Sequence, residues 1–306
     1  MLRFRTLAVL AAAPAALLAT AWLAGGGAGA HASGQLQVAA AENVWGSIAA
    51  QLGGDRVSVT SIVSNPATDP HDYEPTALDA RTLAGARLVI VNGAGYDAWA
   101  PKLLAANPVS GRVVLTVADL VGVRAGGNPH LWYSPEDVRR AVAAITRDFR
   151  ALEPGDAAFF AAREARFEDR ALRGYGAAIA RIRRRFAGTR VGASESVVAP
   201  LARALGLHLG TPAGLLRAVA EGSEPTAQDL ATAGRQLAAH AVRVWIENGQ
   251  NETPDVQRLT AIARAHGIPV ATITETLAPA DTTFQAWQLA QLRRLEAALA
   301  RGARRG

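Results

Sequence analysis

The chain has 306 residues and a mass of 31.9 kDa, which suits one large or two medium domains, since domains usually have roughly 100–200 residues. Half of the residues are apolar and only 19% are charged, which excludes a largely disordered chain. The formal net charge is +6, but the basic residues, all arginines except Lys102, are spread along the chain without interleaved aromatics, so we expect no nucleic-acid partner.

Residues 1–32 have the pattern of a secretory signal peptide. Arg3 and Arg5 precede an apolar run over about 7–23, and small residues with Ala-x-Ala spacing follow. An uncleaved membrane anchor is the alternative, because the run approaches the ~20 residues that a span needs. The sequence has no cysteine, so we expect neither a disulfide nor a lipid-modified cysteine anchor. We therefore expect a periplasmic or secreted protein.

Strands and helices alternate in the residues that follow. Strands are predicted at 36–40 and 57–63 around a helix at about 44–52, and a helix begins at Thr76, whose hydroxyl can cap it. Apolar strands in "RLVIVNG" and "RVVLTV" come next, and then a helix from Ser134 to about Leu152. This alternation predicts a mainly parallel sheet with helices on its faces.

Residues 156–186 keep helical periodicity without a proline. At 1.5 Å per residue, these 31 residues would form a helix of about 45 Å, long enough to cross a whole domain. We predict one continuous helix that links two lobes.

The second half repeats the alternation. Strands are predicted in "TRVGAS", "VRVWIE" and "PVATIT", with helices between them and a terminal helix at about 284–300. The predicted fold is α/β, with two lobes, each a mainly parallel sheet flanked by helices, joined by one long helix. The predicted divisions are a signal peptide at 1–32, an N-terminal lobe at 33–153, the linking helix at 154–186 and a C-terminal lobe at 187–306.

Four loops that follow predicted strands carry residues able to bind a metal. Ligands of open parallel sheets bind at the carboxyl ends of the strands, and imidazole nitrogen with carboxylate oxygen suits a first-row divalent ion. Pro70 and Pro129 would stiffen the loops that hold the two histidines. Taken alone, each histidine would more often be an ordinary loop residue than a metal ligand. The candidate metal ligands are His71, His130, Glu195 and Glu275.

The motifs around these residues resemble a known family. The stretches "SNPATDPHDYEPTALDARTLAGARLVIVNGAGYDAW", "NPHLWYSPEDV", "ESVVAPLARALGL" and "TETLAP…FQAWQLAQLRRLEAAL" are similar to the zinc- and manganese-binding extracytoplasmic solute-binding proteins of metal-uptake ABC transporters. The resemblance implies two α/β lobes with a metal ion between them, held by the same four residues, and an ABC permease as partner. It implies a carrier rather than an enzyme, and we expect a monomer.

Two departures from the family pattern bear on the choice of metal. Glu195 stands where many zinc-binding members have a histidine, and the histidine-rich loop of several members is absent. Two histidines with two carboxylates favour manganese or ferrous iron, whereas zinc binds most such sites more tightly than manganese. Both manganese and zinc therefore stay open as cargo, with ferrous iron as a further possibility.

Other residues are candidates for the site or for a rival function. Glu247 is the best additional ligand, whereas Trp132 and Tyr133 are expected to shield the site. His208, His240 and His266 are expected to be structural. The rival function is a secreted metallohydrolase in which Glu247 or Glu195 acts as general base on a metal-bound water. A third hypothesis, binding of a chelated metal or haem, would need a wider and more apolar cleft.

Overall fold

The computed structural model describes residues 34–67, 70 and 73–304. The expected signal peptide at 1–32, the candidate ligand His71 and its neighbours Asp69 and Asp72 lie outside the described residues. Within these ranges, each helix is too short or too polar to span a membrane.

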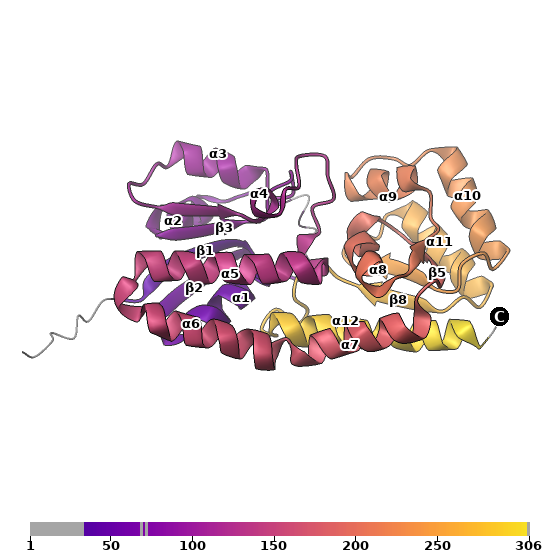
Figure 1. Ribbon diagram of the computed structural model, residues 1–306. Helices are drawn as coiled ribbons and strands as arrows, with labels where there is room; N and C mark the ends of the chain where they lie inside the picture. Colours follow the sequence, from indigo (N-terminus) through magenta and orange to yellow (C-terminus); the bar gives the residue numbers. More distant parts are fainter. Residues whose placement is uncertain (1–33, 68–69, 71–72, 305–306) are drawn as a thin grey trace, which may run out of the picture. The chain divides into compact units, whose positions relative to one another are not determined.

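A four-stranded parallel sheet forms the first half of the structure (Figure 1). Its strand order is β2-β1-β3-β4, and every neighbouring pair is parallel. All residues of β3 are buried, which explains its uninterrupted apolar sequence. The strands are β1 (Leu36–Glu42), β2 (Val57–Val63), β3 (Leu88–Val91) and β4 (Val113–Thr116).

Helices cover both faces of this sheet. Alternate residues of the central strands pack in two separate clusters: Val38 and Ile90 lie with α1 and α5, whereas Ala39 and Val89 lie with α2 and α3. The expected cap at Thr76 is confirmed as a capping box with Asp79. The helices are α1 (Asn43–Gly53), α2 (Ala77–Gly85), α3 (Trp99–Ala106), α4 (Val117–Val121) and α5 (Pro135–Leu152).

A second parallel sheet forms the other half, in the order β6-β5-β7-β8. Its strands are β5 (Arg190–Ala193), β6 (His208–Leu209), β7 (Trp245–Asn248) and β8 (Val270–Ile273). Its helices are α8 (Ala199–Leu205), α9 (Ala213–Ala220), α10 (Ala227–Ala238) and α11 (Pro254–Ala265). The predicted α/β class with two parallel sheets is confirmed. The sequence did not predict α3, α4, α9 or β6, which are too short to show a clear period.

The linking segment differs from the single α-helix expected over 156–186. A 3-10 turn (Pro154–Asp156) leads into α6 (Ala157–Arg166), a π-helical turn (Phe167–Ala171) follows, and α7 (Arg173–Phe186) completes the segment. The amide of Leu172 donates to the carbonyl of Phe167, five residues earlier, at 3.0 Å. Such a wide turn rotates the buried face of a helix, and α6 packs on α1 and α5 while α7 packs on α8 and α12. The continuous-helix prediction is therefore corrected to two helices joined by a π turn.

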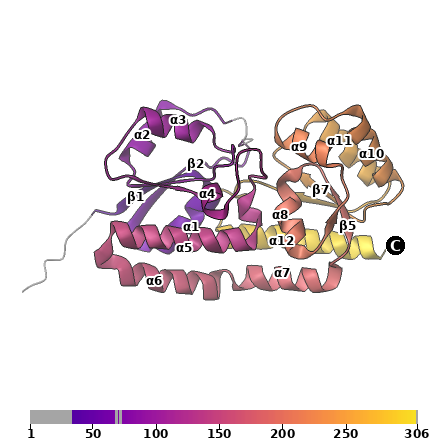
Figure 2. The same cartoon turned by 45° about the horizontal axis from the view of Figure 1, so that its top comes forward.

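The last helix, α12 (Phe284–Ala303), also contacts both halves. It packs along α7 and on β8, and its first turn reaches α1 (Figures 1 and 2). The amide of Phe284 donates to the hydroxyl of Ser47 at 3.0 Å. Near its other end, Glu296 accepts ion pairs from Arg181 and Arg185 of α7. Residues 34–306 thus form one compact unit in which two helical segments run from one sheet to the other.

Candidate metal centre

Two glutamates follow the strands that flank β7. Glu195 comes two residues after β5 and Glu275 two residues after β8, and β7 lies between these strands. The last residue of β7, Asn248, donates from its Nδ2 to the Oε1 of Glu195 and to the Oε1 of Glu275, at 2.6 Å each. Both carboxylates are thereby held at the same edge of the sheet.

His130 comes from the other half of the structure, in the loop between α4 and the 3-10 turn Leu131–Tyr133. The Oδ1 of Asn128 accepts from the His130 backbone amide at 3.0 Å and lies 2.9 Å from its Nδ1. Because Oδ1 is an acceptor, Nδ1 carries the proton in the neutral ring, and Nε2 keeps its lone pair. That Nε2 lies 3.2 Å from the Oε2 of Glu275.

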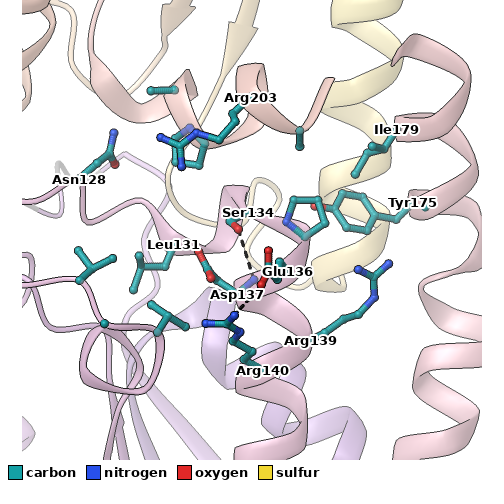
Figure 3. A pocket seen from close by; sticks show the side chains of 18 of the residues that line it. Asn128, Leu131, Ser134, Glu136, Asp137, Arg139, Arg140, Tyr175, Ile179 and Arg203 are labelled. Carbon is teal, nitrogen blue, oxygen red and sulfur yellow. Dashed lines mark hydrogen bonds and ion pairs between the residues drawn. The ribbon is translucent and has the colours of Figure 1, made fainter. Parts of the chain in front are cut away.

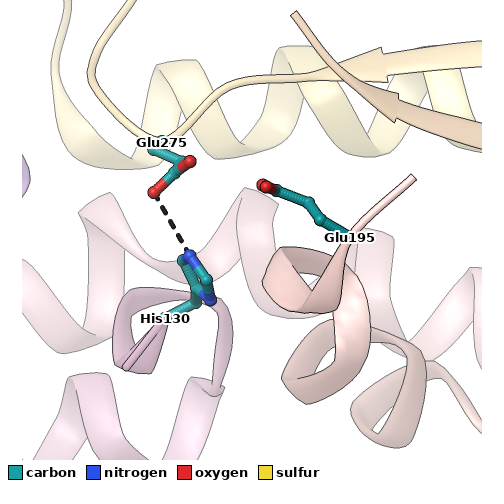
Figure 4. A group of neighbouring side chains, drawn as sticks. All are labelled: His130, Glu195 and Glu275. Carbon is teal, nitrogen blue, oxygen red and sulfur yellow. Dashed lines mark hydrogen bonds and ion pairs between the residues drawn. The ribbon is translucent and has the colours of Figure 1, made fainter. Parts of the chain in front are cut away.

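The three side chains meet in the interior (Figure 4). His130, Glu195 and Glu275 each offer one ligand atom, and these atoms lie within 4.8 Å of one another. None of the three residues is more than 1% exposed. One imidazole nitrogen and two carboxylate oxygens form a donor set suited to a divalent transition metal ion.

Hydrogen bonds from both halves hold Glu275. The hydroxyl of Tyr96 donates to its Oε2 at 2.8 Å. The Oε1 of Gln250 accepts from the backbone amides of Glu275 and Thr276, at 2.6 and 2.9 Å, while its Nε2 donates to the carbonyl of Pro66 at 3.0 Å. Pro66 precedes the loop that carries His71. Gln250 therefore connects the backbone at Glu275 to the segment that leads to His71.

An aromatic wall packs behind His130. The ring of Trp132 lies edge-on to those of His130 and Tyr96, with centroids 5.5 and 5.0 Å apart. Tyr133 donates from its hydroxyl to the carbonyl of Thr274 at 2.6 Å. Both Trp132 and Tyr133 are fully buried, as expected for residues that shield the site. The indole of Trp45 donates to Asn92, which in turn donates to the carbonyl of Pro129 and fixes the loop before His130.

The remaining candidates lie elsewhere in the described structure. Glu247 accepts from the Thr272 hydroxyl at 2.8 Å and pairs with Arg264 at 3.3 Å, so it serves the opposite face of β7 rather than the metal cluster. His240 and His266 are exposed after α10 and α11, with ring centroids 6.2 Å apart.

The side-chain amides and the tyrosine hydroxyl that support the cluster were not predicted from the sequence. Asn248 directly follows Glu247, so side-chain alternation along the strand could have placed one of the two at the site. Asn128 stands two residues before His130 in "NPH", a spacing from which an asparagine can bond the backbone beyond it. Nothing in the sequence pointed to Tyr96.

The sequence is similar to a family of known proteins. The family model described as "Zinc-uptake complex component A periplasmic" matches residues 38–298. The metal ABC transporter substrate-binding lipoprotein FimA of Streptococcus parasanguinis is 30% identical over 147 residues, 44% of this chain and 47% of that protein. The manganese-binding lipoprotein MntA of Halalkalibacterium halodurans is 28% identical over 130 residues, 42% of this chain and 43% of that one. The chain thus spans just under half the length of these curated relatives.

Two solved structures have the same fold. The crystal structure of ZnuA superposes with a TM-score of 0.71 at 22% identity, covering 87% of this chain and 99% of that one. The Mn-bound periplasmic metal binding protein from Candidatus Liberibacter asiaticus has a TM-score of 0.71 at 18% identity, covering 86% and 98%. With the family model matching most of the chain, the protein belongs to the family of periplasmic zinc-uptake complex component A proteins.

Proposed function

We propose that this protein captures a divalent transition metal ion, manganese or zinc, outside the cytoplasmic membrane and delivers it to the permease of an ABC transporter. The observation that carries the proposal is the buried cluster of His130, Glu195 and Glu275, whose ligand atoms lie within 4.8 Å of one another. His71 is proposed as the fourth ligand. The relatives' names, which include a manganese-binding lipoprotein and metal transporter components, support the same cargo class.

The donor chemistry supports a first-row metal ion as cargo. Two buried carboxylates side by side repel each other unless a cation lies between them. Asn248 donates to both and holds them in place, but an amide contributes no net positive charge. A divalent ion would balance the two charges, and the Nε2 of His130 would supply a nitrogen ligand.

The enclosure of the cluster favours a carrier over a hydrolase. A cavity of about 510 Å³ lies nearby, and Tyr96, Asn128 and Pro129 line it, but none of the three clustered ligands does. A hydrolase needs a substrate beside a metal-bound water. Of the two residues considered as general base, Glu247 is engaged by Thr272 and Arg264, and Glu195 is one of the three clustered ligands. The cavity would serve better as a route by which a small ion enters.

Competition titrations with zinc and manganese test the proposal, after analysis of the metal content of protein purified without added metal. Glu195→His replaces a hard oxygen with a softer nitrogen and should shift the zinc-to-manganese affinity ratio toward zinc. Glu195→Ala should weaken both metals by more than about 100-fold, since even second-sphere partners cost about 10–100-fold. Glu247→Gln is the matched control, because it changes a buried glutamate outside the cluster and should leave both affinities unchanged.

Two results would contradict this assignment. If Glu195→Ala binds both metals normally and Glu195→His keeps the wild-type ratio, Glu195 is not a ligand. If the wild-type protein binds neither metal, the carrier function itself fails.

A further inference from the structure

A large cavity separate from the metal cluster lies between α5, α7 and α8 (Figure 3). Its volume is about 1070 Å³, at the upper end of the range for small-molecule sites. None of His130, Glu195 and Glu275 lines it. Leu131, Leu172 and Ile179 give it an apolar surface against which the body of an organic molecule could pack, while one side stays open to solvent.

The charged residues around this cavity are mainly cationic. Five arginines line it against two carboxylates, Glu136 and Asp137. Arg140 pairs with Glu136 at 2.6 Å, but no ion pair engages Arg124, Arg139 or Arg203 in the described part of the chain. All five arginines are solvent-exposed, and they come from both halves of the structure and from the helix between them: Arg124, Arg139, Arg140, Arg183 and Arg203.

A tyrosine whose hydroxyl is buried also lines the cavity. Tyr175 of α7 is 3% exposed, and its hydroxyl has no hydrogen-bond partner among the described residues. Figure 3 shows the ring directed from α7 toward the cavity residues of α5. Leaving a buried hydroxyl unpaired is costly, and native structures seldom do so without a ligand or water to satisfy it.

We propose that this cavity binds an organic anion that carries two or three carboxylates on an apolar body. Guanidinium groups pair with carboxylates through two parallel hydrogen bonds, and the Tyr175 hydroxyl can donate one more. Carboxylates suit the site better than phosphates, because each carries a single charge and Glu136 and Asp137 stand in the same wall. The inference does not depend on which metal the protein carries.

Calorimetric titration with trimesate, a rigid benzene ring bearing three carboxylates, tests the site. Trimesate is a suitable probe because its carboxylates are too far apart to chelate one metal ion together. We expect measurable binding to the full-length protein, loss of binding with the neutral triamide of trimesate, and weaker binding with phenyl phosphate. Equal binding of the triamide, or tighter binding of phenyl phosphate, would overturn the assignment, as would no trimesate binding at concentrations up to about 10 mM, beyond which an affinity has little meaning.

Substitution of single arginines distinguishes a specific binding site from nonspecific attraction by the protein's positive charge. Arg203→Gln and Arg139→Gln should each weaken trimesate binding about 10-fold, the loss expected for a charge-assisted pair. Arg81→Gln removes the same charge from an exposed position on α2 outside the cavity and should bind like the wild type. An equal loss in Arg81→Gln would show that only net charge matters.

Tyr175→Phe separates a role of the hydroxyl in ligand binding from a role in stabilising the fold. It should weaken trimesate binding several-fold while leaving the melting temperature unchanged or slightly higher, because it removes an unsatisfied buried hydroxyl. A lower melting temperature with unchanged binding would show that the hydroxyl serves the fold and not a ligand.

Discussion

Buried glutamates lie at the carboxyl ends of both sheets, but their surroundings differ. Glu42 ends β1 in the first half of the structure, and its Oε2 has no hydrogen-bond partner among the described residues. Glu195 and Glu275 follow strands of the second sheet and accept from side-chain amides, with Asn251 bonding the second oxygen of Glu195 at 3.1 Å. All three glutamates are at most 1% exposed.

The surroundings of Glu42 favour its protonated form. Burial, and then the nearby Asp97 carboxylate, raises the pKa of Glu42 well above its usual value. Burial also raises the pKa of Asp97, but Asp97 accepts from the backbone amides of Asn92 and Gly93, at 2.7 and 2.9 Å, which lower it again. Glu42 is therefore the member of the pair that keeps a proton. Donors around a buried carboxylate favour its charged form, which a metal ion requires.

Glutamine substitutions at the two kinds of glutamate should give the largest contrast. Glu275→Gln removes a charged ligand and should lower metal affinity by more than about 100-fold, whereas Glu42→Gln replaces one neutral group with another and should change it by less than about 2-fold. Competition with a chromophoric chelator measures both. Similar losses of metal affinity in the two variants would contradict the distinction between a charged ligand at Glu275 and a neutral side chain at Glu42.

Removal of Asn248, the hydrogen-bond donor that Glu195 and Glu275 share, should have the next largest effect on metal affinity. Asn248→Ala deprives both carboxylates of their 2.6 Å hydrogen bonds and should weaken metal binding by about 10–100-fold. Asn251→Ala breaks one longer hydrogen bond to Glu195 and should cost less. An Asn251→Ala loss that equals or exceeds the Asn248→Ala loss would argue against Asn248 as the main support.

The protonated state of Glu42 predicts a pH effect on stability. Above the usual value of 4.5 the unfolded chain loses this proton while the folded chain keeps it, so stability falls as pH rises toward the raised folded pKa. Glu42→Gln removes this decline, which amounts to about 1.4 kcal/mol per pH unit within that window. Denaturant unfolding of both proteins between pH 4 and pH 7 measures it. A constant stability difference across that range would contradict the protonated assignment.

Glu296, whose side chain is 14% exposed, should give the smallest effect of pH on stability, with the opposite sign. Hydrogen bonding to Arg181 lowers the pKa of Glu296 below 4.5, so its contribution is present above that value and is lost as pH falls through the folded pKa. Because exposed ion pairs contribute little, Glu296→Gln should lower the melting temperature at neutral pH by about 2 °C or less. The difference should vanish in acid, and its persistence there would assign it to packing instead.

The sequence by itself predicted the fold class, which is confirmed, and four candidate ligands, of which three lie together in the structure. Periodicity located most strands and helices, and ligands bind at the carboxyl ends of parallel strands, so the loops after those strands could be searched in each half. Together with the family resemblance, this is why His130, Glu195 and Glu275 could be chosen before their distances were known. His71, chosen by the same argument, remains a prediction. The divisions at residues 153 and 187 also remain predictions.

Only the tertiary structure decided how these parts are supported. Periodicity reports which side of a helix is buried but not what covers it, so neither the π turn in the linking segment nor the reach of α12 could be foreseen. Phe284 and Ser47 are 237 residues apart and yet share a hydrogen bond. The roles of Asn248 and Tyr96 likewise depend on strand order and on the approach of the two sheets. Local sequence determines local conformation, whereas contacts between distant residues form only when the whole chain has packed.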